Sequence, residues 1–185
     1  MQEGTIGRRY ARALALALQQ APAERLQQVE EQLVALAGLL DRRSGQADFR
    51  QAMRNPSFSA DQRKAVLAQI AKAHSFDEST TTFLALLVDK DRLAHLPGIA
   101  RAFRNEVDAR LGRVRATIVT AKGLDPKTLT EIIAGLEKKT GKKVVPDVEV
   151  DATLIAGVQA RIGGLVYDAS VKTQLDRLRA GFNVQ

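Results

Sequence analysis

The chain has 185 residues, no cysteine and 45% hydrophobic residues, which is the composition of a folded globular protein of one or two domains. Its 28 Lys and Arg against 21 Asp and Glu give a net charge of +7, spread over both halves of the chain. The missing cysteines exclude disulfide frameworks, thiolate metal sites and cysteine nucleophiles, and no stretch is apolar for the roughly 18 to 20 residues that a bilayer-spanning helix needs.

Helical periodicity runs through the first half of the chain, up to about residue 111. Apolar residues recur at spacings of 3 and 4 from Leu26 to Leu40, which predicts one buried stripe along a helix. Ser59 with Gln62 three residues later predicts a capping box, Phe76-Asp77 opens the next helix, and Gly112 stands where a left-handed helix cap is favoured. Helices are therefore expected over about residues 6–18, 22–42, 49–53, 79–90 and 97–111, with one more opening at Ser59, and they predict an all-α bundle of about six helices.

The pattern changes to period two after Gly112. Val114, Ala116 and Ile118 alternate with polar residues, as in a half-buried strand, and Asp125-Pro126 together with Gly141 brackets an amphipathic helix. Further strands are expected over about residues 144–150, 158–162 and 165–167, with a turn at Gly163-Gly164 and a final helix from about Ser170 that carries Val171, Leu175 and Leu178. The predicted fold class is an α+β two-part chain, with a helical bundle over residues 1–108 and a small α/β domain of β-α-β-β-α order over residues 113–185.

Residue sets for catalysis or cofactor binding are missing from the sequence. Gly135, Gly141 and Lys142 come near a phosphate-binding loop, but five residues separate the glycines and neither Ser nor Thr follows the lysine. His74 and His95 stand near helix ends without a second His, Cys or paired carboxylate beside them, so structural roles are expected. No serine lies in a hydrolase elbow. The sequence therefore predicts a protein that is not an enzyme, with no catalytic, cofactor-binding or metal-binding residues.

Two of the expected helices carry more apolar surface than one core-facing stripe needs. In the first helix, Ile6, Tyr10, Leu14 and the small residues around them fill an arc of roughly 200°, about twice what a surface helix requires. Residues 83–88 are all apolar and so surround the axis of their helix. Two compatible interpretations stay open: both helices are central in the bundle, or they lie side by side and form a groove for a partner's amphipathic helix.

The sequence also resembles a known family. Arg9-Tyr10-Ala11-Arg12-Ala13-Leu14, Asn55-Pro56 before a capped helix, and Arg92-Leu93 followed by Leu96-Pro97 and Phe103 are similar to the delta subunits of bacterial F-type ATP synthases, called OSCP in mitochondria. The most specific similarity is C-terminal, to the family's Val-Asp-x-x-Leu-Ile-Gly-Gly-Val, Arg-Ile-Gly-Asp and Asp-Gly-Ser stretches. The matching positions there are Asp151, Gly157, Arg161, Gly163, Asp168 and Ser170, whereas Ala156 and Ala169 replace usual glycines and Gly164 a usual Asp.

The resemblance implies a non-catalytic stator subunit without cofactors. In this family the first and fifth helices of an N-terminal six-helix bundle grip the N-terminal helix of an alpha subunit, and the C-terminal domain contacts the ends of the peripheral-stalk b subunits. Together they hold the catalytic head against rotor torque during proton-driven ATP synthesis. Carried onto this sequence, the groove candidates are Tyr10, Ala13, Leu14 and Ala17 on the first helix and Phe83, Leu86 and Leu87 on the fifth, while the stalk contact is only a region, about 150–180.

The resemblance further implies a monomer within a hetero-oligomeric complex, bound to the cytoplasmic face of the bacterial inner membrane through its partners and not inserted in the bilayer. Arg8, Arg9 and Arg12 would suit a transit peptide, but no serine precedes Ser44, so no leader is expected. From the residues alone, the alternative is a basic nucleic-acid-binding protein, favoured by the +7 charge and the β-α-β-β order. That alternative predicts affinity that falls steeply with salt, whereas a stator subunit is expected to have no nucleic-acid partner.

Overall fold

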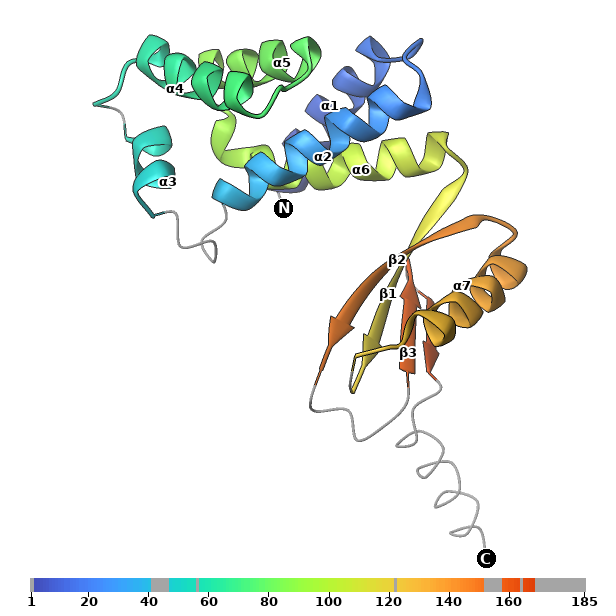
Figure 1. Cartoon of the computed structure of the whole chain (residues 1–185). Helices are drawn as coiled ribbons and strands as arrows, with labels where there is room; N and C mark the ends of the chain where they lie inside the picture. Colours follow the sequence, from blue (N-terminus) through green and yellow to red (C-terminus); the bar gives the residue numbers. More distant parts are fainter. Residues whose placement is uncertain are drawn as a thin grey trace, which may run out of the picture. The chain divides into compact units, whose positions relative to one another are not determined.

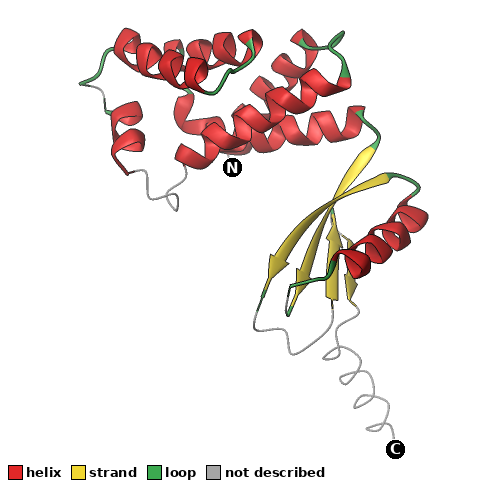
Figure 2. Ribbon diagram, viewed as in Figure 1, coloured by secondary structure: helices red, strands yellow, loops and turns green. Residues whose placement is uncertain are grey.

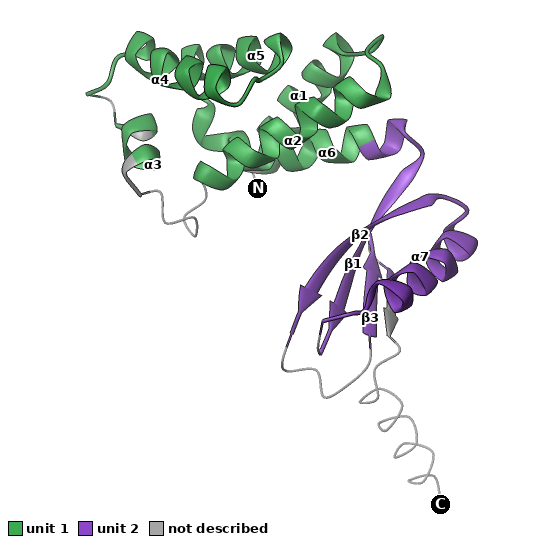
Figure 3. Cartoon of the chain, in the orientation of Figure 1, with its two compact units in different colours: residues 1–107 green, residues 108–185 purple. Residues whose placement is uncertain are grey.

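A computed structural model describes residues 2–40, 47–55, 57–121, 123–151, 158–163 and 165–168. The chain divides into two compact units, residues 1–107 and residues 108–185 (Figure 3). The predicted fold class is confirmed, because helices make up the first part and a small mixed sheet with one described helix makes up the second (Figure 2).

Unit 1 is a bundle of α-helices around an aliphatic core (Figure 1). The predicted stripe of the second helix is buried, with Leu26, Val29, Leu33, Leu36 and Leu40 each at most 3% exposed. Ile99, Phe103 and Val107 of the last helix complete the core from another side. The elements are α1 (Gln2–Ala17), α2 (Ala23–Leu40), α3 (Ala47–Arg54), α4 (Ala60–Ala73), α5 (Glu78–Asp89), the short 3-10 helix η1 (Leu93–His95) and α6 (Leu96–Arg110).

The helix ends follow the capping chemistry written in the sequence. The Ser59 hydroxyl accepts from the Gln62 amide at 3.2 Å, and the Gln62 side chain accepts from the Ser59 amide at 2.9 Å, which is the predicted capping box. Asp77 caps α5 by accepting from the Ser79 amide at 2.8 Å. Helix α1 begins at Gln2, four residues earlier than expected.

Helices α1 and α6 cross at a close backbone contact. A Cβ added to Gly7 would lie 3.1 Å from both the carbonyl carbon and the carbonyl oxygen of Gly98. Real Cβ atoms seldom come so near to backbone atoms. The glycine at position 7 therefore sets how closely α1 lies on the start of α6.

Unit 2 is a four-stranded sheet with one described helix packed against it. The strands β1 (Arg113–Thr120), β2 (Lys143–Val150), β3 (Val158–Ile162) and β4 (Leu165–Asp168) lie in the order β2-β1-β3-β4, and α7 (Pro126–Thr140) connects the parallel pair β1 and β2. The pairs β1/β3 and β3/β4 are antiparallel, and Ile162 faces Leu165 across the turn that holds Gly163 at φ 57°. The predicted caps of α7 are present: Asp125 accepts from the Thr128 amide, and Gly141 is left-handed.

The core of unit 2 lies between α7 and one face of the sheet. Ala116, Ile118, Val144 and Ala160 from three strands pack with Leu136 of α7. The helix expected from Ser170, with Val171, Leu175 and Leu178, lies outside the described residues.

Candidate helix-binding groove

A groove of about 710 Å³ lies between α1 and α5 in unit 1. Apolar and small side chains line its centre, and three charged side chains, Arg9, Glu78 and Lys90, contribute to its lining. The remaining lining residues are Tyr10, Ala13, Leu14, Ala17, Ser79, Thr82, Phe83 and Leu86. The groove therefore contains every residue predicted for it from the two helices except Leu87.

Besides Arg9, the α1 wall consists of Tyr10, Ala13, Leu14 and Ala17. These four are spaced 3, 1 and 3 apart, which places them on one helix face. Leu14 is 5% exposed and anchors this wall in the core, whereas Ala13 and Ala17 are exposed and leave room above the backbone. The ring of Tyr10 meets the ring of Phe83 edge to face, with centroids 6.5 Å apart and planes at 66°. This aromatic pair joins the two walls in the preferred T-shaped geometry.

The apolar run of α5, residues 83–88, is divided between the core and the groove. Leu84, Leu87 and Val88 are at most 2% exposed and face the core. Phe83 is 6% exposed at the floor of the groove, and Leu86 is 43% exposed at its surface. The expectation for Leu87 is wrong, because this residue is fully buried and lines no part of the groove.

The surplus apolar surface lies in both of the expected places, the core of the bundle and the wall of a groove. Helix α1 buries Ala11 and Leu14 in the core and still presents Ala13 and Ala17 to solvent. Leu16, which shares the arginine side of α1, is 60% exposed and does not line the groove. The two helices are thus core elements on one face and groove walls on another.

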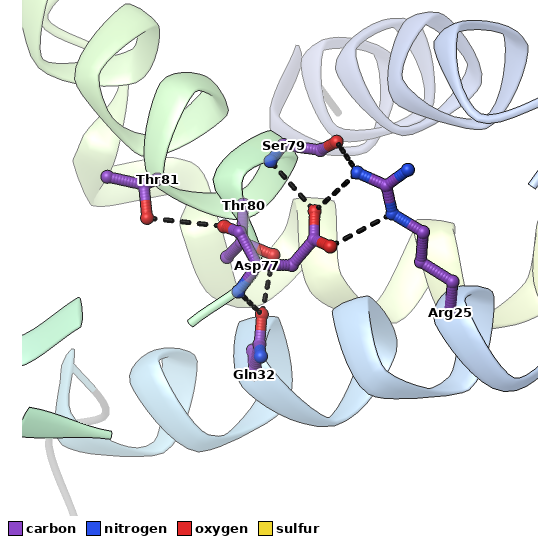
Figure 4. A network of polar contacts seen from close by, with 6 residues as sticks. All are labelled: Arg25, Gln32, Asp77, Ser79, Thr80 and Thr81. Carbon is purple, nitrogen blue, oxygen red and sulfur yellow. Dashed lines mark hydrogen bonds and ion pairs between the residues drawn. The ribbon is translucent and has the colours of Figure 1, made fainter. Parts of the chain in front are cut away.

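A polar network fixes the N-terminus of α5 to α2 (Figure 4). The Arg25 guanidinium donates to both carboxylate oxygens of Asp77, at 2.9 and 3.2 Å, and to the Ser79 hydroxyl at 3.0 Å. On the other side, Gln32 Oε1 accepts from the Asp77 amide at 3.0 Å and from the Thr80 hydroxyl at 2.7 Å. Glu78, Ser79 and Thr82, which line the groove, come within the five residues after Asp77. This network therefore holds the α5 wall in place.

Hydrogen bonding also sets the ionisation of this pair. The bond from Arg25 holds the pKa of the Asp77 carboxyl below its usual value, with help from the Ser79 amide and hydroxyl and against the cost of desolvation. The same bond raises the pKa of Arg25 above its ordinary value. The sequence predicted that a helix opens at Phe76-Asp77 but not that Arg25 and Gln32 are bonded there. One signal was available, because Gln32 is a polar residue on the apolar side of α2, next to Leu33.

Both histidines lie at helix ends. His74 is the C-cap of α4, and its ring lies 6.2 Å from the ring of Phe76. His95 is half-buried in a second cavity of about 500 Å³, which Gly4 and Arg8 of α1 share with Gly98 and Arg101 of α6. Among the described residues, no three His, Cys, Asp or Glu side chains gather as a metal site would require.

The C-terminal residues singled out by the resemblance belong to unit 2. Asp151 is exposed just after β2, and its amide donates to the Thr120 carbonyl at 2.9 Å. Arg161 lies on β3 with its guanidinium bonded to Gln159 Oε1, Gly163 occupies the β3/β4 turn, and Asp168 ends β4. Gly157 and Ser170 lie outside the described residues.

Comparison with known proteins gives a consistent result along the whole chain. A family model described as "ATP synthase delta (OSCP) subunit" matches residues 6–182. The chain is 40% identical over 180 residues to the "ATP synthase subunit delta" of Trichlorobacter lovleyi, covering 96% of each sequence, and 41% identical over 180 residues to that of Anaeromyxobacter dehalogenans strain 2CP-1, covering 97% of each. A chain in a solved structure of the Toxoplasma gondii mitochondrial ATP synthase hexamer matches with a TM-score of 0.69 and 27% identity, over 100% of this chain and 99% of that one.

Proposed function

Since this chain belongs to the ATP synthase delta (OSCP) subunit family, we propose that its α1/α5 groove binds the N-terminal helix of an alpha subunit. The chain is a non-catalytic stator subunit of the synthase, and it is bound to the catalytic head. Its task is mechanical, because a stator must resist the torque that the rotor delivers to the head. The family assignment favours this function over the alternative of a nucleic-acid-binding protein.

The groove itself carries this proposal. An amphipathic helix binds through residues spaced i, i+3, i+4 and i+7, and it needs an apolar channel with few polar groups at its floor. Helix α5 has 12 residues, so the channel beside it is about 18 Å long and accommodates roughly three turns of a docked helix. Tyr10 is the strongest candidate for an anchor, since it lines the channel and aromatic residues dominate binding hot spots.

Unit 2 is proposed to contact the C-terminal ends of the peripheral-stalk b subunits. Support comes from apolar side chains that the described part of the sheet leaves exposed on both of its edge strands. Val148 and Val150 on β2 are 41% and 63% exposed, and Leu165 and Val166 on β4 are 63% and 55% exposed. Exposed apolar residues grouped on sheet edges are typical of interaction surfaces. Two binding surfaces on one chain raise the effective concentration for the second contact once the first has formed.

The delta subunit is a peripheral component of a membrane complex. Within the described residues, no helix combines the length and the apolar character needed to cross a bilayer. We place the chain on the cytoplasmic face of a bacterial inner membrane, attached through its protein partners. The bacterial sources of the similar sequences support this location.

Calorimetric titration tests the groove directly. The full chain is titrated with a peptide copying the N-terminal helix of the alpha subunit from the same organism, at low and at high salt. One-to-one binding that largely survives high salt is expected, because most of the contact is apolar. Tyr10→Ala should weaken binding at least tenfold, whereas Leu16→Ala, an exposed residue of the same helix outside the groove, should leave affinity unchanged. Absence of binding, or an equal effect of both variants, would refute the proposal.

A further inference from the structure

The two walls of the groove run in opposite directions. Arg25, near the start of α2, is bonded to Asp77 and Ser79 at the start of α5. Because α2 follows α1 after a short turn, the C-terminal end of α1 lies near the N-terminal end of α5. At the other end, Gly4 and Arg8 of α1 share a cavity with Ala94 and His95, which come just after α5. Helices α1 and α5 are therefore antiparallel along the groove.

This arrangement separates the charges of the groove by sign. Glu78, the first residue of α5, lies at the end where α1 reaches Ala17. Lys90, the C-cap of α5, lies at the opposite end of the groove. Arg9 is the α1 lining residue nearest to that end. One end of the channel is thus acidic and the other carries two cations.

The two cations are available to a ligand. The acids on either side of Lys90 are already paired, Asp89 with Lys64 of α4 and Asp91 with Arg63 of α4. Arg9 and Lys90 are exposed and form no ion pair with a described side chain. A docked helix that brings carboxylates to this end gains two new contacts without breaking an existing pair.

We propose that the charge pattern of the groove fixes the direction of the docked helix, so that its acidic first turn lies beside Arg9 and Lys90 and it runs antiparallel to α5. This inference rests on the proposed function and adds to it the chemistry and orientation of the occupant. Acidic residues favour the first turn of a helix because they interact with its positive end. The reversed orientation would bring that acidic turn beside Glu78, where like charges repel each other.

The size of the effect follows from the exposure of the charges. Each exposed ion pair contributes little, so two such pairs and one avoided repulsion correspond to an affinity difference of roughly threefold to thirtyfold between the two orientations. Apolar contact with Tyr10, Phe83 and Leu86 remains the main source of affinity in either orientation. Charge thus selects the direction of the helix, and apolar burial holds it.

Paramagnetic relaxation measures the direction without any change to the groove. A nitroxide is attached to a single cysteine at either the first or the last residue of the alpha-subunit peptide. Because the chain itself has no cysteine, this nitroxide is the only label in the complex. With the full-length chain isotope-labelled, the first-residue label should broaden the amide signal of Lys90 and spare that of Ser79. The last-residue label should do the opposite.

Charge reversal provides the second measurement. The double variant Arg9→Glu/Lys90→Glu should bind the peptide threefold to thirtyfold more weakly at low salt, with a smaller difference at high salt. Arg12→Glu is the matched control, because Arg12 is an exposed cation of α1 that does not line the groove. Replacing the first-turn acids of the peptide by Gln should abolish the difference between the wild type and the double variant.

The outcomes separate this inference from the proposed function. Binding with the reversed broadening pattern, or binding that Arg12→Glu weakens as much as the double variant does, overturns the orientation and leaves the groove assignment standing. No binding in any condition overturns both. The expected broadening pattern together with a selective effect of Arg9 and Lys90 supports both.

Discussion

Replacing Asp77 separates the two tasks of its carboxylate, which caps α5 and pairs with Arg25. Asp77→Ala removes the acceptor of the Ser79 amide and both bonds from the guanidinium. We expect it to lower the free energy of unfolding by about 1 to 2 kcal/mol, most of it from the lost cap. The ion pair adds only a minor share, because the Arg25 side chain is 42% exposed and solvent screens the interaction.

Asp77→Asn keeps the cap and removes the charge. Asn is as good an N-cap as Asp, so this variant should lose less than half of what Asp77→Ala loses. Asp125 provides the matched control: it caps α7 through the Thr128 amide at 2.9 Å and has no arginine partner among the described side chains. Asp125→Asn should therefore cost less stability at neutral pH than Asp77→Asn does, because only hydrogen bonds such as those from Thr128, and no arginine, lower the pKa of Asp125.

The pH dependence gives the sign of the charge contribution. The folded-state pKa of Asp77 lies below its ordinary value because of the bond from Arg25. Its stabilising effect is therefore complete above the unfolded-state pKa of about 3.9 and is lost as the pH falls through the lower folded-state pKa. The stability difference between the wild type and Asp77→Asn should stay constant at neutral pH and shrink below about pH 4.

Urea unfolding followed by circular dichroism, repeated across this pH range on the full-length variants, measures these differences. The division between cap and charge is refuted if Asp77→Asn loses as much stability as Asp77→Ala. It is also refuted if the stability difference between the wild type and Asp77→Asn does not shrink in acid.

Two further pairs of substitutions test the packing of the groove helices α1 and α5. Leu87→Ala should lower the free energy of unfolding by about 2 to 5 kcal/mol, because it empties a fully buried site. Leu86→Ala should leave urea unfolding nearly unchanged and weaken peptide binding in calorimetry. The reverse pattern would contradict the assignment of Leu87 to the core and Leu86 to the groove. Gly7→Val should destabilise the chain by about 1 to 3 kcal/mol, since its Cβ would meet the backbone of Gly98 at 3.1 Å, while Gly4→Ala, whose Cβ would meet only the Arg8 side chain at 3.6 Å, should not lower the melting temperature.

Helix caps and turns were predictable from the sequence wherever one short segment contains both of the interacting residues. The capping box at Ser59 and Gln62 and the left-handed Gly141 depend on neighbours within a few residues. The buried stripe of α2 follows from its period alone. These features therefore agree between the sequence analysis and the structure.

Features that depend on packing between distant segments were not predictable in the same way. A run of apolar residues shows that α5 is covered on most sides but does not tell which side faces the core, which is why Leu87 was misplaced next to Leu86. The bond between Arg25 and Asp77 joins residues 52 positions apart and requires knowing that α2 lies beside the start of α5. The strand order β2-β1-β3-β4 likewise comes from tertiary pairing and not from the alternation within each strand.

The separation of the two groove walls along the chain has a consequence for biosynthesis. Helix α1 emerges from the ribosome first, yet its partner wall follows only after α2, α3 and α4 have been made. Because domains fold as units during synthesis, the apolar face of α1 has no native cover until α5 is available. A truncated product that ends before residue 78 would carry half of a binding surface and an exposed helix prone to aggregation. The groove is thus complete only late in translation, when α5 has joined α1 in the folded bundle.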